Sequence, residues 1–212
     1  MQNVIKNFNI IKREISNNKV NLIAVTKTFP IKHILPVIND GHEHFGENKV
    51  QEAIEKWTSI KEDFPKIKLH LIGKLQTNKA KFVLPLFDYI HSMDNIKLAS
   101  KIADEQIKKK FKPKIFIQVN IGNEQQKSGV NIDNIENFYR ICLEEFKLNI
   151  IGLMCIPPFD QDSEPYFKKM NELNQSFGLK ELSMGMSSDY HNAINNGATF
   201  IRIGSKIFGE RS

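Results

Sequence analysis

Lys27 is the residue whose type and position point most directly to chemistry. It ends an apolar run at residues 22–26, and a period of two places it on one strand face with Ile23 and Val25. A lysine beside two β-branched apolar residues is partly desolvated, which favours the free amine that forms a Schiff base with an aldehyde. The alternative is a strand-end lysine whose head group reaches solvent.

Arg202 is the second candidate. It alternates with Ile201 and Ile203, so it shares a strand face with Phe200 and Gly204. An arginine on an inward face needs an acceptor. The sequence leaves two choices open, an ion pair with a neighbouring carboxylate and a contact with a bound ligand.

Small polar residues and glycines follow the last two predicted strands. They are Gly185, Ser187, Ser188, Gly204 and Ser205. Glycine lets backbone N–H groups approach a phosphate, and serine adds a hydroxyl donor. In a (β/α)₈ barrel these two loops frequently bind phosphate. The alternative is that they are ordinary turn residues.

An imine-forming lysine, a phosphate site and an arginine together suggest pyridoxal 5′-phosphate. Its aldehyde would bond to Lys27, its phosphate would lie beyond the last two strands, and Arg202 would face the pyridine nitrogen. Because arginine stays protonated, that nitrogen would receive no proton from it, and the ring would be a weak electron sink.

The elements that must position these residues alternate along the chain. A helical pattern at residues 2–16 comes first, followed by eight apolar strand candidates. These strands are expected at 22–26, 43–46, 67–72, 89–92, 114–121, 149–156, 181–185 and 199–203. Helices are expected at 31–40, 48–63, 76–86, 94–110, 132–146, 163–177, 189–196 and 205–209. The pattern predicts an α/β fold, a single (β/α)₈ barrel over residues 1–212 with an extra N-terminal helix.

Composition excludes several other classes. No apolar run reaches about 18 residues, and the N-terminus lacks a signal-peptide core, so we expect a cytoplasmic protein without a membrane segment. Nucleotide-binding glycine motifs are absent from the sequence. The net charge of +6 comes mostly from dispersed lysines, which argues against nucleic-acid binding. His42 and His44 lack an evident third metal ligand, and Cys155 is expected to pack as a small hydrophobe.

Across nearly its whole length the chain resembles the pyridoxal phosphate homeostasis protein family (the YggS or PROSC proteins). The blocks that support this occur in order at 24–28 (AVTKT), 45–48 (FGEN), 70–79 (HLIGKLQTNK), 91–94 (HSMD), 118–120 (QVN), 127–129 (KSG), 152–154 (GLM), 182–187 (LSMGMS), 197–205 (GATFIRIGS) and 207–209 (IFG). The resemblance implies an alanine-racemase-like barrel with pyridoxal phosphate on Lys27. It assigns phosphate contacts to Ser187, Gly204 and Ser205, the pyridine partner to Arg202 and a contact near the ring to Asn48. The chain departs from the family pattern at Lys49, Lys74 and Ser188.

The resemblance also implies a role in intracellular storage, buffering or delivery of the cofactor, without established catalysis. The expected partners are pyridoxal phosphate and the apoenzymes that use it, and the protein is predicted to be a monomer. The main alternative is a weak amino-acid racemase or another Schiff-base enzyme, with His70 as its acid or base. A related racemase carries a second domain, for which residues 206–212 leave no room. A third hypothesis, a salt-sensitive nucleic-acid or surface-binding module, rests on the +6 charge alone.

Overall fold

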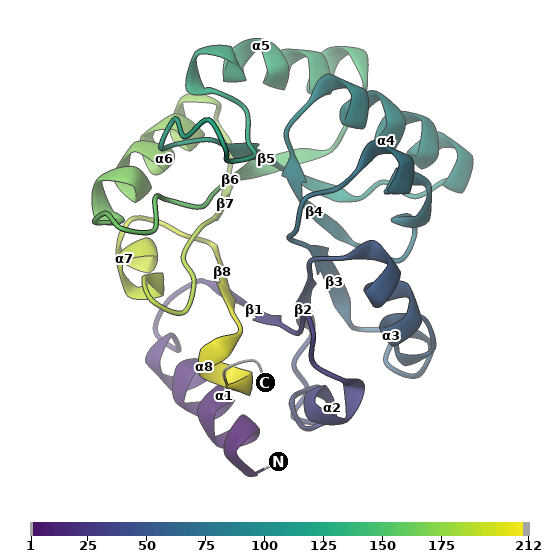
Figure 1. The fold of residues 1–212 in the computed structure, drawn as a ribbon, viewed down its shortest axis with the longest axis vertical. Helices are drawn as coiled ribbons and strands as arrows, with labels where there is room; N and C mark the ends of the chain where they lie inside the picture. The colour runs from purple at the N-terminus through teal and green to yellow at the C-terminus, as the bar shows by residue number, and fades with distance from the viewer. Residues whose placement is uncertain (1, 210–212) are drawn as a thin grey trace.

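Eight parallel strands close into one barrel in the computed structural model, which describes residues 2–209 (Figure 1). They are β1 (Asn21–Val25), β2 (His44–Glu47), β3 (Lys68–Leu71), β4 (Tyr89–Met93), β5 (Lys114–Val119), β6 (Ile150–Cys155), β7 (Glu181–Ser183) and β8 (Phe200–Ile203). The ring closes where β8 pairs with β1, with Arg202 opposite Ile23. The predicted single (β/α)₈ barrel is confirmed.

Helices surround the barrel on its outer side (Figure 1). They are α1 (Gln2–Glu14), α2 (Ile31–Asn39), α3 (Val50–Asp63), α4 (Ile96–Lys109), α5 (Ile135–Arg140), α6 (Glu164–Ser176), α7 (Tyr190–Asn195) and α8 (Ser205–Phe208). The predicted extra N-terminal helix is α1, which lies against α2 and α8. Among the described residues, none of the helices has the length and apolarity needed to cross a bilayer.

Two predicted helices have a different local form. Residues 76–86 form only the short 3₁₀ helix η1 (Thr77–Phe82). Pro85, which lacks an N–H, does not favour its continuation as a helix. Residues 132–146 form three consecutive segments, the 3₁₀ helix η2 (Ile132–Asn134), α5 and the π-helical η3 (Ile141–Glu145). Sequence periodicity alone does not separate these helix types.

The barrel interior is packed with side chains. Its apolar part consists of Ile23, Tyr89, Phe116, Met154 and Phe200, each at most 6% exposed. A second and larger core fills the space between the strands and the outer helices. The interior is therefore filled below the carboxyl ends of the strands, and a ligand site has to lie at those ends.

Candidate functional site

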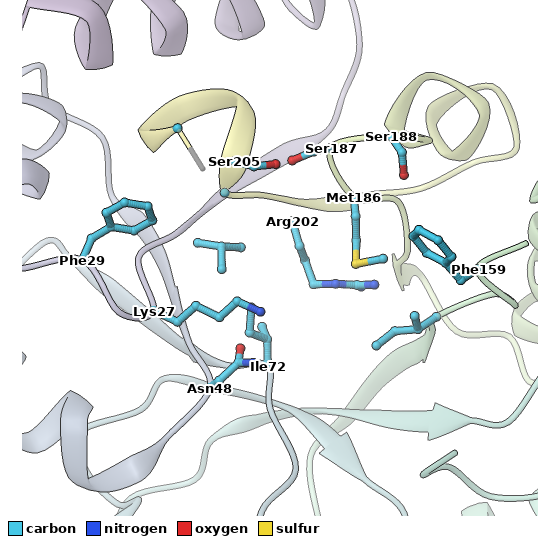
Figure 2. A pocket seen from close by; sticks show the side chains of 14 residues that line it. Lys27, Phe29, Asn48, Ile72, Phe159, Met186, Ser187, Ser188, Arg202 and Ser205 are labelled. Carbon is cyan, nitrogen blue, oxygen red and sulfur yellow. The ribbon is translucent and has the colours of Figure 1, made fainter. Parts of the chain in front are cut away.

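A cavity of about 710 Å³ opens at the carboxyl ends of the strands. The six residues that the sequence singled out all line it: Lys27, Asn48, Ser187, Arg202, Gly204 and Ser205. Figure 2 shows Ser187 and Ser205 near α8, with Lys27 and Asn48 on another side and Arg202 between. The volume is in the range of small-molecule sites. The fold thus brings together residues that lie far apart in the sequence.

Lys27 lies two residues beyond the end of β1 and extends into this cavity (Figure 2). The face predicted from the period of two is correct. Ile23 lies in the barrel interior, and Val25 and Lys27 line the cavity. That the Lys27 amine is uncharged and able to form a Schiff base stays a prediction.

The backbone before Lys27 is held from outside the barrel by a buried carboxylate. Glu47 Oε1 accepts hydrogen bonds from Thr26 Oγ1 at 2.7 Å, Lys56 Nζ at 2.9 Å and Trp57 Nε1 at 2.9 Å. Lys56 also donates to the Thr26 carbonyl at 2.9 Å. Glu47 and Trp57 are fully buried, so the strand end is fixed against α3.

The residue after Lys27 is held by the same helix. Thr28 has a φ of +69°, which a β-branched residue rarely adopts. Its N–H donates to Glu52 Oε1 at 2.7 Å, and Lys56 bonds the same carboxylate at 3.0 Å. Burial acts to raise the pKa of Glu52, but the bonds from Thr28 and Lys56 lower it below the usual value. We call Glu47, Glu52, Lys56 and Trp57 the clamp.

Arg202 projects from β8 and is 5% exposed. Its Nη1 donates to Ser183 Oγ at 2.7 Å and its Nη2 donates to the Cys155 carbonyl at 2.9 Å. The ion pair left open by the sequence is not formed, because no carboxylate within the described chain lies at ion-pair distance from Arg202. These two bonds use two of the five guanidinium N–H donors, so three remain on a side chain that lines the cavity.

Two of the predicted loop glycines have different environments. A Cβ on Gly204 would lie 3.2 Å from the Val25 carbonyl oxygen, so this position keeps the cavity wall close to β1. Gly185 does not line the cavity. It has a φ of +90°, a Cβ there would meet Ala193 Cβ at 2.5 Å, and its carbonyl accepts from the Arg202 N–H. Packing against α7 therefore explains Gly185.

Asn48 directly follows β2 and carries a polar atom without a partner. Its Oδ1 is buried and makes no hydrogen bond within the structure. A Cβ on Gly73 would lie 2.4 Å from the Asn48 carbonyl oxygen, so glycine at position 73 lets this backbone approach closely. This buried oxygen borders the cavity, where it is available as an acceptor for a bound group.

His70, the acid or base that the racemase alternative would need, does not line the cavity. It is fully buried in the barrel interior and stacks on Tyr89, with ring centroids 4.1 Å apart. Both of its ring nitrogens lie 2.9 Å from nitrogens of other histidines, His44 and His91. The sequence did not predict this histidine chain.

His42 and Cys155, the two remaining sequence candidates, are packed against other side chains of the protein. His42 packs its ring against Phe8 and Phe45, and no group of three metal-ligating side chains occurs in the described range 2–209. Cys155 is fully buried, and burial raises the pKa of its thiol to about 12. It packs as a small hydrophobe, as predicted.

Comparisons with known proteins agree on one family. Residues 1–212 match the family described as alanine racemase, N-terminal domain. A protein of Aquifex aeolicus named pyridoxal phosphate homeostasis protein is 38% identical over 203 residues, which are 92% of this chain and 88% of that protein. The protein of the same name from Escherichia coli K12 is 34% identical over 92% of this chain and 88% of its own length.

Solved structures agree with this. PipY of Synechococcus elongatus PCC7942, solved with pyridoxal phosphate (PLP) bound, is 32% identical, covers 97% of this chain and 100% of its own, and has a TM-score of 0.89. An alanine racemase of Clostridium difficile 630 has a TM-score of 0.78 at 12% identity, with 100% of this chain and 57% of the racemase covered. The racemase likeness concerns the fold alone.

Proposed function

The chain belongs to the alanine racemase N-terminal domain family and to its pyridoxal phosphate homeostasis proteins, and from this premise we propose that it holds pyridoxal 5′-phosphate as a Schiff base on Lys27. The observation that supports this most strongly is the single cavity lined by all six residues predicted for that cofactor. PipY, a relative with the same barrel, was solved with pyridoxal phosphate bound.

The residues of the cavity fit this cofactor. Asn48 Oδ1 is a buried acceptor that a ligand group would satisfy. Ser187 and Ser205 offer two hydroxyl donors, and Arg202 lines the cavity and keeps unused donors. When bound, the cofactor supplies an aldehyde that condenses reversibly with a primary amine.

The chain's own groups favour holding over strong carbanion chemistry. Lys27 supplies the amine, with its neighbours Thr26 and Thr28 fixed by the clamp. Arg202 donates hydrogen bonds and cannot give up its proton, so a ring nitrogen beside it stays unprotonated. The racemase alternative named His70 as the acid or base, and that side chain is separated from the cavity.

These properties support a binding protein that stores, buffers or delivers the cofactor inside the cell. Its proposed partners are pyridoxal phosphate and the apoenzymes that receive it. We expect a cytoplasmic monomer. Delivery is tested by mixing the loaded protein with several apoenzymes. Reactivation should be faster than with an equal concentration of free cofactor, and equal rates would leave storage or buffering as the role.

The binding proposal is tested by mixing the protein with pyridoxal phosphate and reducing the mixture with borohydride. The wild type should acquire a visible absorption band and, after reduction and tryptic digestion, one modified peptide that contains Lys27. Lys27→Ala should lose both. Lys74→Ala is the matched control, because Lys74 is exposed and does not line the cavity. A wild type that takes up no cofactor would overturn the proposal.

A further inference from the structure

A line of polar side chains crosses the barrel interior below the cavity. His44 Nδ1 lies 2.9 Å from His70 Nε2, and His70 Nδ1 lies 2.9 Å from His91 Nε2. His91 Nδ1 lies 2.9 Å from Ser183 Oγ, the same oxygen that accepts from Arg202. The line thus joins β2, β3, β4 and β7 to the arginine on β8.

This line is enclosed by aromatic rings. His70, His91 and Ser183 are fully buried, and His44 at the far end is half-buried. His91 stacks on Phe116 with ring centroids 4.3 Å apart, as His70 stacks on Tyr89. Polar groups in such surroundings are tolerated only when each is hydrogen-bonded, so the bonds of the line are required by its location.

The direction of the hydrogen bonds follows from Arg202. A guanidinium only donates, so Ser183 Oγ accepts from it and has its own proton to donate to His91 Nδ1. His91 then donates from Nε2 to His70 Nδ1, and His70 donates from Nε2 to His44 Nδ1. The reverse direction would leave the Ser183 proton without an acceptor among its contacts. One arrangement therefore satisfies every member.

The same arrangement keeps the line neutral. Burial lowers the pKa of His70 and His91 well below the ordinary value, and the Arg202 charge lowers that of His91 further. Burial also lowers the pKa of His44, where Glu43 and Asp88 oppose the effect and Lys114 and Lys68 add to it. Each imidazole thus has one donor nitrogen and one acceptor nitrogen.

We infer that His91 and His70 are positioning residues for Arg202, which hold the Ser183 hydroxyl as its acceptor and so direct its remaining donors into the cavity. The inference rests on the proposed function, since the group that receives those donors is the ring nitrogen of bound pyridoxal phosphate. A chain of aligned hydrogen bonds polarises its members, so a change at His70 reaches Arg202 through His91 and Ser183.

The test compares variants loaded with pyridoxal phosphate. His91→Phe and Ser183→Ala should weaken cofactor binding on the order of tenfold, as expected for one lost hydrogen bond to a charged group. They should also shift, by about half a pH unit or more, the pH at which the absorption of the bound cofactor changes. His91→Asn, which keeps an acceptor for the Ser183 proton, should recover most of both effects. His42→Phe is the matched control, because His42 is a half-buried histidine whose ring is not a member of the line and whose Nε2 makes no hydrogen bond.

Unchanged affinity and pH midpoint in a folded His91→Phe protein would overturn the inference, as would an equal shift in His42→Phe. Should the variants not fold, nitrogen NMR of the wild-type histidines in the absence of cofactor still decides. His91 and His70 should bear their proton on Nε2 and stay neutral below the ordinary histidine pKa near 6.5. A proton on Nδ1 of either would overturn the inference. A wild type that binds no pyridoxal phosphate would instead overturn the proposed function.

Discussion

The two basic residues of the cavity are supported in opposite ways. Lys27 lies between Thr26 and Thr28, whose backbone groups are held from outside the barrel by the charged clamp residues Glu52 and Lys56. Arg202 is held by its own head group from inside the barrel, through Ser183 and a line of neutral imidazoles.

The difference follows from where the supports lie. The clamp is situated between a strand end and α3, where the side chain of Lys56 is 9% exposed and that of Glu52 is 27% exposed. Glu52 and Lys56 keep some contact with solvent, and the fully buried Glu47 carboxylate is paired with Lys56. The barrel interior excludes solvent, and burying a charge there costs more free energy than burying a hydrogen-bonded neutral group. A neutral chain of hydrogen bonds is therefore suited to fixing a polar group in this place.

The largest expected effect is on the pH dependence of folding stability, where the buried histidines and the clamp should act in different pH ranges. Burial lowers the pKa of His42 to about 4 and holds those of His70 and His91 well below the ordinary value near 6.5. Unfolded chains bind these protons below about pH 6.5 and the folded protein does not, so stability falls as the pH is lowered. His42 alone should remove about 2.5 kcal/mol of stability by pH 4.5. His70 and His91 should add losses in the same direction, all measured by urea denaturation.

The clamp should respond in a lower pH window. The pKa of Glu52 is depressed, so the contribution of Glu52 to stability is complete above the ordinary carboxyl pKa and is lost only as the pH falls through the folded value.

The histidine effect is tested by His42→Phe. This substitution should reduce the slope of unfolding free energy against pH, between pH 6.5 and 4.5, by about 1.4 kcal/mol per pH unit. A stability profile that is flat from pH 7.5 to 5 would refute this division.

The next largest effect tests the clamp directly. Glu47→Ala leaves the Lys56 ammonium, the Trp57 N–H and the Thr26 hydroxyl without their shared acceptor, and should lower the free energy of unfolding by about 3–5 kcal/mol. Glu47→Gln keeps an oxygen acceptor and should lower it by about 1–2 kcal/mol.

Glu55→Ala is the control for both substitutions. Glu55 lies on the same helix but is exposed, so its loss should change stability by no more than about 0.5 kcal/mol. Equal stability of the Glu47→Gln and wild-type proteins would show that the charge of this carboxylate is not needed.

The smallest effect concerns the turn after Lys27. Glu52→Gln keeps an acceptor for the Thr28 N–H and removes one charge that faces Lys56, so we expect a loss of about 1 kcal/mol or less. The loss should shrink further in high salt. A loss as large as that of Glu47→Ala would mean that the partly exposed half of the clamp is the dominant one.

The fold was predictable because its signals are local. The strands are short segments between helical patterns, most of them rich in apolar residues, and parallel strands separated by helices admit few topologies. The boundaries and helix types were less predictable at 76–86 and 132–146, where short segments take 3₁₀ or π form. Those forms depend on the packing of the finished barrel as well as on local preference.

The site was predictable in part. Lys27, Arg202 and the two serine loops follow from strand ends and residue types, whereas the role of Asn48 beside the ring came from the family resemblance. The histidine chain was missed because it depends on register, which places His70 opposite Gly46 on β2 and opposite Tyr89 on β4. The i,i+4 spacing of Glu52 and Lys56 was a signal for the clamp, but Glu47 joins them only through the turn into α3.

The packed floor of the barrel has a consequence for traffic. Side chains fill the interior below the cavity, and Phe159, 98% exposed, stands at its mouth. A molecule that reaches Lys27 must enter and leave through the same opening. Uptake and release therefore use the same opening of the cavity. Any protein that takes the molecule directly has to bind at the rim of that opening.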